Sequence, residues 1–168
     1  KLDYIQFKNK LWNIIIKKSE PERENSFLNI AFERANKGCF FITPSCNKDT
    51  LIDLTKDGVL GYEEAGYFIT HDIYEEWALE KIIYREFINK DNNKSFFNRI
   101  GNSLPIRRCF RNWLSEKLLL EDTDIKVFIE EIIDDTNIET FWKDELFISV
   151  LLSDYAKTFF DIFEEELL

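Results

Sequence analysis

The 168-residue chain contains no methionine, not even at position 1, and it contains a single histidine, His71. Because an open reading frame begins with methionine, we expect Lys1 to be an interior residue of a longer chain, or else a processed end. A lone histidine excludes zinc sites built from several histidines, and we expect no metal site. The three cysteines form no CxxC pair, which indicates reduced thiols and a cytoplasmic location.

Other absences restrict the function further. No GxxxxGK[ST] motif occurs, so no loop in this chain would cradle a triphosphate and present a lysine to it. No apolar run approaches the roughly 20 residues of a membrane-spanning helix. The formal net charge is −10, whereas nucleic acids and anionic membranes are bound largely through lysine and arginine. We therefore expect no nucleic-acid partner, no membrane partner and no self-sufficient catalytic site.

The chain is rich in apolar residues, which make up 45% of it and include 16 phenylalanines. This is enough for one or two small cores. Apolar residues recur at helical spacing along most of the sequence. The helices expected from this spacing cover 3–18, 22–37, 47–56, 73–87, 95–100, 104–120, 123–133 and 145–163.

Some of these helices carry more specific expectations. In 3–18, one face at helical spacing carries Tyr4, Phe7, Leu11, Ile14 and Ile15. Gly38 is expected to end the second helix. The helix over 123–133 has the clearest pattern, with apolar residues at i, i+3, i+4, i+7 and i+8. Residues 138–143 are expected to form a short link before the last helix.

The middle of the chain differs in composition and favours β-strands. Residues 39–43 are aromatic and β-branched, which predicts a short strand. Residues 59–62 and 67–70 flank a turn and predict a β-hairpin. The order helix, strand, helix, hairpin is typical of a winged helix. The expected fold is therefore mainly α: a linker helix over 1–19, a winged helix over 20–88 and an α-helical bundle over 89–168.

The sharpest local feature is Thr70-His71-Asp72-Ile73, where a strand runs into a helix. A helix N-terminus presents free N–H groups and positive partial charge, which favour anions such as phosphate. A histidine there can donate a hydrogen bond to a phosphate oxygen. The ordinary interpretation is that Asp72 and Glu75 cap the helix and that His71 merely precedes the cap. From the residues alone, capping is favoured.

The stretch 57–79 resembles the winged-helix segment of STAND NTPases, and most of all bacterial members that act as antiphage sensors. Its Thr70-His71-Asp72-Ile73 step resembles their Met-His-Asp motif, although Thr70 stands where methionine is usual. In that family the histidine contacts the β-phosphate of bound ADP and the aspartate shapes the turn. The resemblance thus implies that His71 and Asp72 are nucleotide-binding residues. A more diffuse similarity continues through 101–108, 142–146 and 150–153.

The resemblance also implies what surrounds this segment. The segment would hold the ADP-bound resting state and transmit activation, without being an enzyme itself. The nucleotide, ADP or ATP, would be bound in the parent protein, whose upstream NTPase domain would be the main partner. The phosphate-binding loop and the magnesium-binding aspartates would then precede Lys1. Further protein partners or self-association are expected.

Two other functions are open to an acidic chain with this fold. A winged helix often reads DNA with its second helix, but here that helix carries Asp49 and Asp53 beside its lysines, and the expected wing carries Glu63 and Glu64. DNA binding is therefore disfavoured. An acidic protein-binding module, such as an immunity-type inhibitor or adaptor, remains an alternative.

The basic cluster of the chain lies on one expected helix face and consists of Arg107, Arg108 and Arg111. Ion pairing with nearby carboxylates is the favoured interpretation. A contact with a partner or a nucleotide is the weaker alternative.

Overall fold

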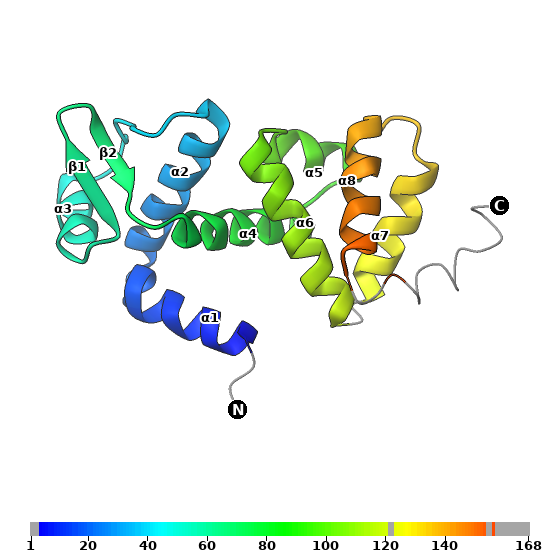
Figure 1. The fold of residues 1–168 in the computed structure, drawn as a ribbon, viewed down its shortest axis with the longest axis horizontal. Helices are drawn as coiled ribbons and strands as arrows, with labels where there is room; N and C mark the ends of the chain where they lie inside the picture. Colours follow the sequence, from blue (N-terminus) through cyan, green and yellow to red (C-terminus); the bar gives the residue numbers. More distant parts are fainter. Residues whose placement is uncertain (1–3, 121–122, 154–155, 157–168) are drawn as a thin grey trace. The chain divides into compact units, whose positions relative to one another are not determined.

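The computed structural model describes residues 4–120, 123–153 and 156. These residues are mainly α-helical and include one small antiparallel β-hairpin, followed by further helices (Figure 1). The mainly α fold with a winged-helix-like element is thus confirmed. The chain divides into two compact units, Lys1–Ile82 and Ile83–Leu168, and the boundary falls inside helix α4. None of the described helices is long and apolar enough to cross a lipid bilayer.

The N-terminal unit contains the winged-helix-like element. The helix over Pro21–Lys37 ends at Gly38, as expected. Gly38 has a φ of 61° and donates its N–H to the carbonyl of Arg34, which is typical of a glycine that ends a helix. The apolar side chains of the helices and the hairpin form one core that includes Phe27, Leu54 and Leu60. In chain order the elements are α1 (Tyr4–Trp12), the π-helix η1 (Asn13–Lys17), α2 (Pro21–Lys37), α3 (Lys48–Lys56), β1 (Leu60–Glu63), β2 (Gly66–Ile69) and α4 (Asp72–Ile88).

The hairpin β1–β2 forms the wing, with Leu60 opposite Ile69. The strand expected over 39–43 is reduced to a single bridge between Ile42 and Tyr67. Gly66 allows this bridge to form so close to the turn, because its φ is +126° and a Cβ atom there would lie 2.6 Å from the carbonyl oxygen of Ile42. The wing therefore has two strands and one bridging residue.

The first helix buries a different face from the stripe noted in the sequence. Trp12 and Ile16 are buried, whereas Tyr4, Phe7 and Ile14 are about half exposed or more. Trp12 packs against the ring of Phe27 and donates its indole N–H to the carboxylate of Glu24 at 2.5 Å. The segment has two apolar stripes, and this polar contact, together with the π-helical turn, selects the stripe of Trp12. Helical periodicity alone does not distinguish the two.

A buried arginine secures the turn between η1 and α2. Arg23 is 3% exposed, and its Nε donates to the carbonyl oxygen of Ile16 at 2.6 Å. Its Nη2 also lies 2.8 Å from the carboxylate of Asp57, to which Lys18 Nζ donates at 2.6 Å. The turn itself passes through Lys18 and Ser19, whose φ values of 46° and 64° are costly for residues with a Cβ atom. The ion pairs with Asp57 therefore offset a strained turn.

The C-terminal unit packs four further helices around aromatic side chains. The residues expected to form a link over 138–143 instead include the start of the last helix, at Thr140, because Trp142 is buried and stacks on Phe97 with centroids 4.6 Å apart. That helix ends at Leu151, since Leu152 lies in a turn and Ser153 in a bend, so the unbroken helix expected over 145–163 is wrong at these two positions. Ala156 is again helical, and 154–155 and 157–163 lie outside the described residues. The helices are α5 (Asn93–Ile100), α6 (Leu104–Leu119), α7 (Thr123–Asp134) and α8 (Thr140–Leu151).

A buried carboxylate joins α6 to α8. Glu145 is 3% exposed, and its Oε1 accepts from Nε and Nη2 of Arg107 at 2.7 and 2.5 Å. Its Oε2 lies 3.3 Å from Nη1 of Arg111. The expected ion pairing of these two arginines is thus confirmed. The sequence did not identify Glu145 as the partner, because it lies 38 residues from Arg107.

Replacing the buried carboxylate should destabilise the C-terminal unit. In Glu145→Gln the shape is kept but two guanidinium groups lose their counter-charge. Each guanidinium is about one third exposed, so water compensates in part. We expect a loss of about 2–4 kcal/mol in unfolding free energy, measured from hydrogen exchange of α6 and α8 amides. The control Asp144→Asn, at the exposed neighbouring position, should change it by less than about 0.5 kcal/mol. Equal effects of the two variants would contradict the role of Glu145.

Acid should weaken the turn held by Asp57. The hydrogen bond from Lys18, together with the charge of Arg23, lowers the pKa of Asp57 below its ordinary value. Its stabilisation is therefore complete above the ordinary pKa of about 3.9 and is lost as pH falls through the lower folded-state pKa. Asp57→Asn should be less stable than the original chain at pH 7, and this difference should shrink in strong acid.

The measurement is urea unfolding at a series of pH values, followed by NMR signals from α2. The matched control is Asp53→Asn, an exposed aspartate of α3, the helix that Asp57 follows, and its carboxylate lies 3.9 Å from Lys56. A stability difference for Asp57→Asn that stays constant down to the lowest pH would refute the ion-pair explanation.

Candidate functional site

The candidate site is the junction between the last strand of the wing and α4. Thr70 and His71 connect Ile69, the end of β2, to Asp72, the start of α4. The N–H of Thr70 donates to the carbonyl of Val59 at 3.2 Å, and its hydroxyl donates to the carbonyl of Gly58 at 2.6 Å. These bonds tie the junction to the turn that precedes β1. The position of His71 relative to the wing is thereby fixed.

His71 is exposed, and its ring stands edge-on to the ring of Tyr74, with centroids 5.4 Å apart at 86°. The carbonyl of His71 accepts the N–H of Tyr74 at 3.0 Å, which closes the first turn of α4. Among the residues that the structure describes, the imidazole nitrogens have no hydrogen-bond partner. The ring is therefore oriented by Tyr74 and open to a ligand arriving from outside this unit.

Asp72 is the first residue of α4, so His71 occupies the position immediately before the helix. The carboxylate of Asp72 is exposed. Glu75, which the sequence suggested as its capping partner, directs its carboxylate to Arg34, with Nη1 and Oε2 2.9 Å apart. Both side chains of that pair are largely buried, at 11% and 13% exposure. The first turn of α4 thus carries one paired carboxylate and one that faces solvent.

This electrostatic setting determines what the junction can bind. The N-terminus of α4 favours an anion, whereas the exposed carboxylate of Asp72 opposes one. His71 offers one directed hydrogen bond, and His71 and Asp72 are both exposed. A phosphate could therefore be contacted from one side here, and its other contacts would have to come from elsewhere. No group of three or more histidine, cysteine, aspartate or glutamate side chains within the described ranges is arranged to hold a metal ion.

Sequence reasoning missed the residues that support the junction. Arg34 pairs with Glu75 and also lies over the ring of Phe40, 5.2 Å from its centroid. Phe40 in turn stacks on Phe68 of β2. Phe68 covers Gly61, where a Cβ atom would lie 2.1 Å from the Phe68 ring. A glycine paired with an aromatic residue in the hairpin register was a usable signal for this packing. The ion pair between Arg34 and Glu75 was not visible in the sequence, because the two residues are 41 positions apart.

Comparison with protein-family models and with curated proteins finds no match for this chain. The functional interpretation of His71 and Asp72 therefore rests on the geometry of the junction and on the resemblance carried by their motif.

Removing the Thr70 hydroxyl should loosen the junction. Thr70→Val keeps the shape of the side chain but deletes the hydrogen bond to Gly58, which should lower the free energy of local opening by about 1 kcal/mol. Hydrogen exchange of the β1 and β2 amides measures this change. Thr43→Val, at an exposed position before α3, is the matched control and should leave these amides unaffected. Unchanged protection in Thr70→Val would show that the hydroxyl does not hold the junction.

Proposed function

We propose that this chain is the regulatory, non-catalytic winged-helix and helical segment of a STAND-type NTPase. In this proposal His71 contacts the β-phosphate of ADP and stabilises the resting state of the parent protein, which acts in the cytoplasm as an antiviral sensor. The observation that supports it most directly is the exposed imidazole, oriented by Tyr74 at a junction that Thr70 fixes to the wing.

The nucleotide would be bound by the upstream NTPase domain of the same protein. That domain would supply the phosphate-cradling loop and the magnesium-binding carboxylates, and His71 would add one hydrogen bond from the winged-helix side. A hydrogen bond to a charged group contributes about 1.5–3 kcal/mol, or about 10- to 150-fold in an equilibrium constant. ADP would shift the population towards the resting arrangement because only that arrangement contains this contact.

Asp72 would act by shaping the turn that presents His71. Its carboxylate is exposed at the first position of α4, where acidic residues stabilise a helix N-terminus. A direct contact between this carboxylate and a phosphate would be repulsive. The proposal therefore assigns the phosphate contact to His71 and the support of the turn to Asp72.

The proposal includes no role in DNA binding. The second helix of a winged helix would enter the major groove, and here α3 exposes Asp53 and Ile52 beside Lys56. Lys56 itself lies 3.9 Å from the carboxylate of Asp53. Such a surface lacks the positive charge that phosphate contacts require.

The test is His71→Ala in the protein that joins this segment to its NTPase domain. Loss of the hydrogen bond should weaken ADP binding by about 10- to 100-fold and should favour the active state. ADP released from the purified, denatured protein gives its occupancy, and displacement of a fluorescent ADP analogue gives its dissociation rate. Asn25→Ala, at an exposed position on α2, is the control. Unchanged occupancy and dissociation in His71→Ala would remove the sensor role.

A second candidate function is an acidic protein-binding module, such as an immunity-type inhibitor. It is favoured by the tip of the wing, where Glu63 and Glu64 are both exposed, and by the net charge of −10. The coding sequence upstream of Lys1 distinguishes the two. A GxxxxGK[ST] motif after an apolar strand within roughly 300 residues would favour the NTPase. A start codon directly before Lys1 would favour the inhibitor, whose association with a basic partner would slow steeply with salt.

A further inference from the structure

The helix α1 and the following η1 expose a stripe of large apolar side chains. Tyr4, Phe7 and Ile14 are 61%, 47% and 56% exposed, and they lie on the side away from the buried Trp12 and Ile16. We call Tyr4, Phe7 and Ile14 the apolar stripe. Several large apolar side chains exposed together on one helix are typical of an interaction surface.

The same segment is basic in an acidic chain. Residues 4–17 contain three lysines and no acidic residue. Lys8 pairs with Glu80 at 2.6 Å and Lys17 with Glu24 at 3.2 Å. The third, Lys10, is exposed and follows Phe7 by three positions and precedes Ile14 by four, so it flanks the apolar stripe. A partner for this surface must combine apolar side chains with negative charge.

The C-terminal unit contains a groove of that character, with a volume of about 750 Å³. Its apolar rim includes Ile88 and Val127, which are 59% and 52% exposed. Lys90 is the one cation among the residues that line it. The carboxylates that line the groove are Asp91, Asp124, Glu131 and Asp135. We call this feature the acidic groove.

Two details indicate that the acidic groove suits an ammonium group. Lys90 Nζ lies 3.9 Å from the ring centroid of Phe87 and 5.3 Å from that of Phe128, so an ammonium already rests on the aromatic wall. Asn93 is 8% exposed, and its Nδ2 donates to Glu131 at 2.8 Å. This bond fixes the orientation of the amide and leaves its Oδ1 without a hydrogen-bond partner. A buried acceptor of this kind is stabilised by a nearby donor.

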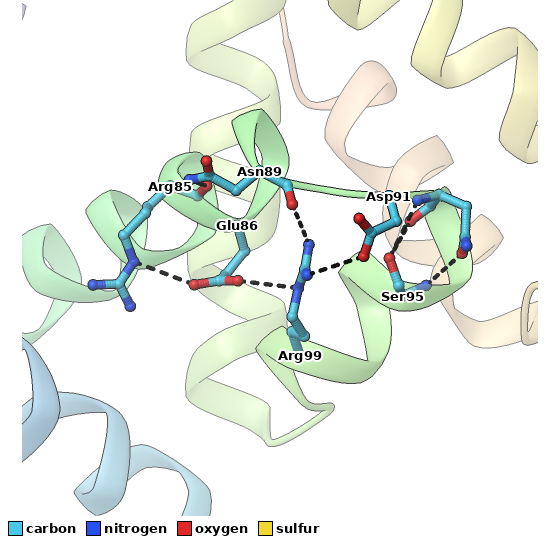
Figure 2. Close-up of polar contacts among 7 residues, drawn as sticks. Arg85, Glu86, Asn89, Asp91, Ser95 and Arg99 are labelled. Carbon is cyan, nitrogen blue, oxygen red and sulfur yellow. Dashed lines mark hydrogen bonds and ion pairs between the residues drawn. The ribbon is translucent and has the colours of Figure 1, made fainter.

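Arg99 contacts Asp91, a residue that lines the groove, and also binds the end of α4, as the contacts in Figure 2 show. Its guanidinium lies 3.1 Å from Glu86 and 3.5 Å from Asp91, and it donates to the carbonyl of Asn89 at 2.8 Å. The side chains of Asn92 and Ser95 cap α5 reciprocally. The loop between α4 and α5 is therefore fixed before any ligand binds, which lowers the entropic cost of binding.

We propose that the acidic groove of one copy of this chain binds the apolar stripe of a second copy. Phe7 and Ile14 would contact the rim at Val127, and the ammonium of Lys10 would lie among the groove carboxylates. The charges are complementary, since the charged residues within 4–17 are all lysines and the groove lining carries four carboxylates against one lysine. This inference does not depend on nucleotide binding and stands apart from the proposed function.

The two surfaces are different, so the contact is heterologous. Each copy that binds through its stripe still presents a free groove, and the assembly grows head to tail until a ring closes or a filament forms. This geometry makes a sharp test possible, because a copy altered in one surface keeps the other.

The test uses two variants of the 168-residue chain. Lys10→Glu introduces a repulsive charge beside the stripe, and Val127→Lys introduces one at the groove rim. Both positions are exposed, so folding should be retained, as circular dichroism would verify. Sedimentation equilibrium over a wide concentration range should show self-association of the original chain and at least about tenfold weaker association of each variant. An equimolar mixture of the two variants should form a 1:1 dimer that grows no further, since one intact stripe meets one intact groove.

The matched controls are Lys48→Glu and Ile52→Lys, which make the same changes in charge at exposed positions of α3 and should associate like the original chain. A monomeric original chain at every concentration would overturn the proposal. So would single variants that associate normally, controls that weaken association equally, or a variant mixture that stays monomeric.

Discussion

The position of the candidate site depends on the buried guanidinium of Arg23, which requires hydrogen-bond and ion-pair partners. Arg23 is almost completely buried, and an unpaired guanidinium at such a position would cost several kcal/mol. It is satisfied by a carbonyl of η1 and by Asp57, the residue that caps the C-terminus of α3. Gly58, directly after Asp57, accepts the hydroxyl of Thr70, and Thr70 precedes His71. Polar contacts, together with the direct chain connections from Asp57 to Gly58 and from Thr70 to His71, therefore link η1 through the turn before the wing to the junction.

The sequence predicted most elements of the fold because their signals are local. Gly38 ends α2 through its own left-handed conformation, and the turn before Gly66 separates two short apolar runs. The predictions that were wrong involve choices settled by distant residues. Glu24 accepts the indole N–H of Trp12 and so helps to select the buried face of α1. The ring of Phe97 packs on Trp142 and extends α8 towards its N-terminus. No pattern within a helix contains such information.

In the candidate site too, the features that depend on local sequence were predicted, and those that depend on distant residues were not. The strand-to-helix step and the exposed His71 follow from the order of residues, and the sequence located them. Arg34, which pairs with Glu75, belongs to another helix, and its role emerges only from the fold. This pair also changes the electrostatics of the junction. With Glu75 neutralised, Asp72 carries the unpaired charge closest to His71 in sequence, so an anion at the imidazole would meet less repulsion than the acidic residues of the first turn suggest.

The distribution of charge reconciles a net charge of −10 with association between copies. Repulsion between whole molecules acts over distances longer than the Debye length, which is about 8 Å at physiological ionic strength, and salt screens it strongly. An ammonium within a groove of carboxylates interacts over a few ångströms and is screened less, particularly where apolar side chains exclude water. Residues 4–18 carry lysines and no acidic residue, and four carboxylates line the acidic groove. Moderate salt therefore weakens the general repulsion more than the local attraction, and the sign of the net charge does not decide whether the two surfaces bind.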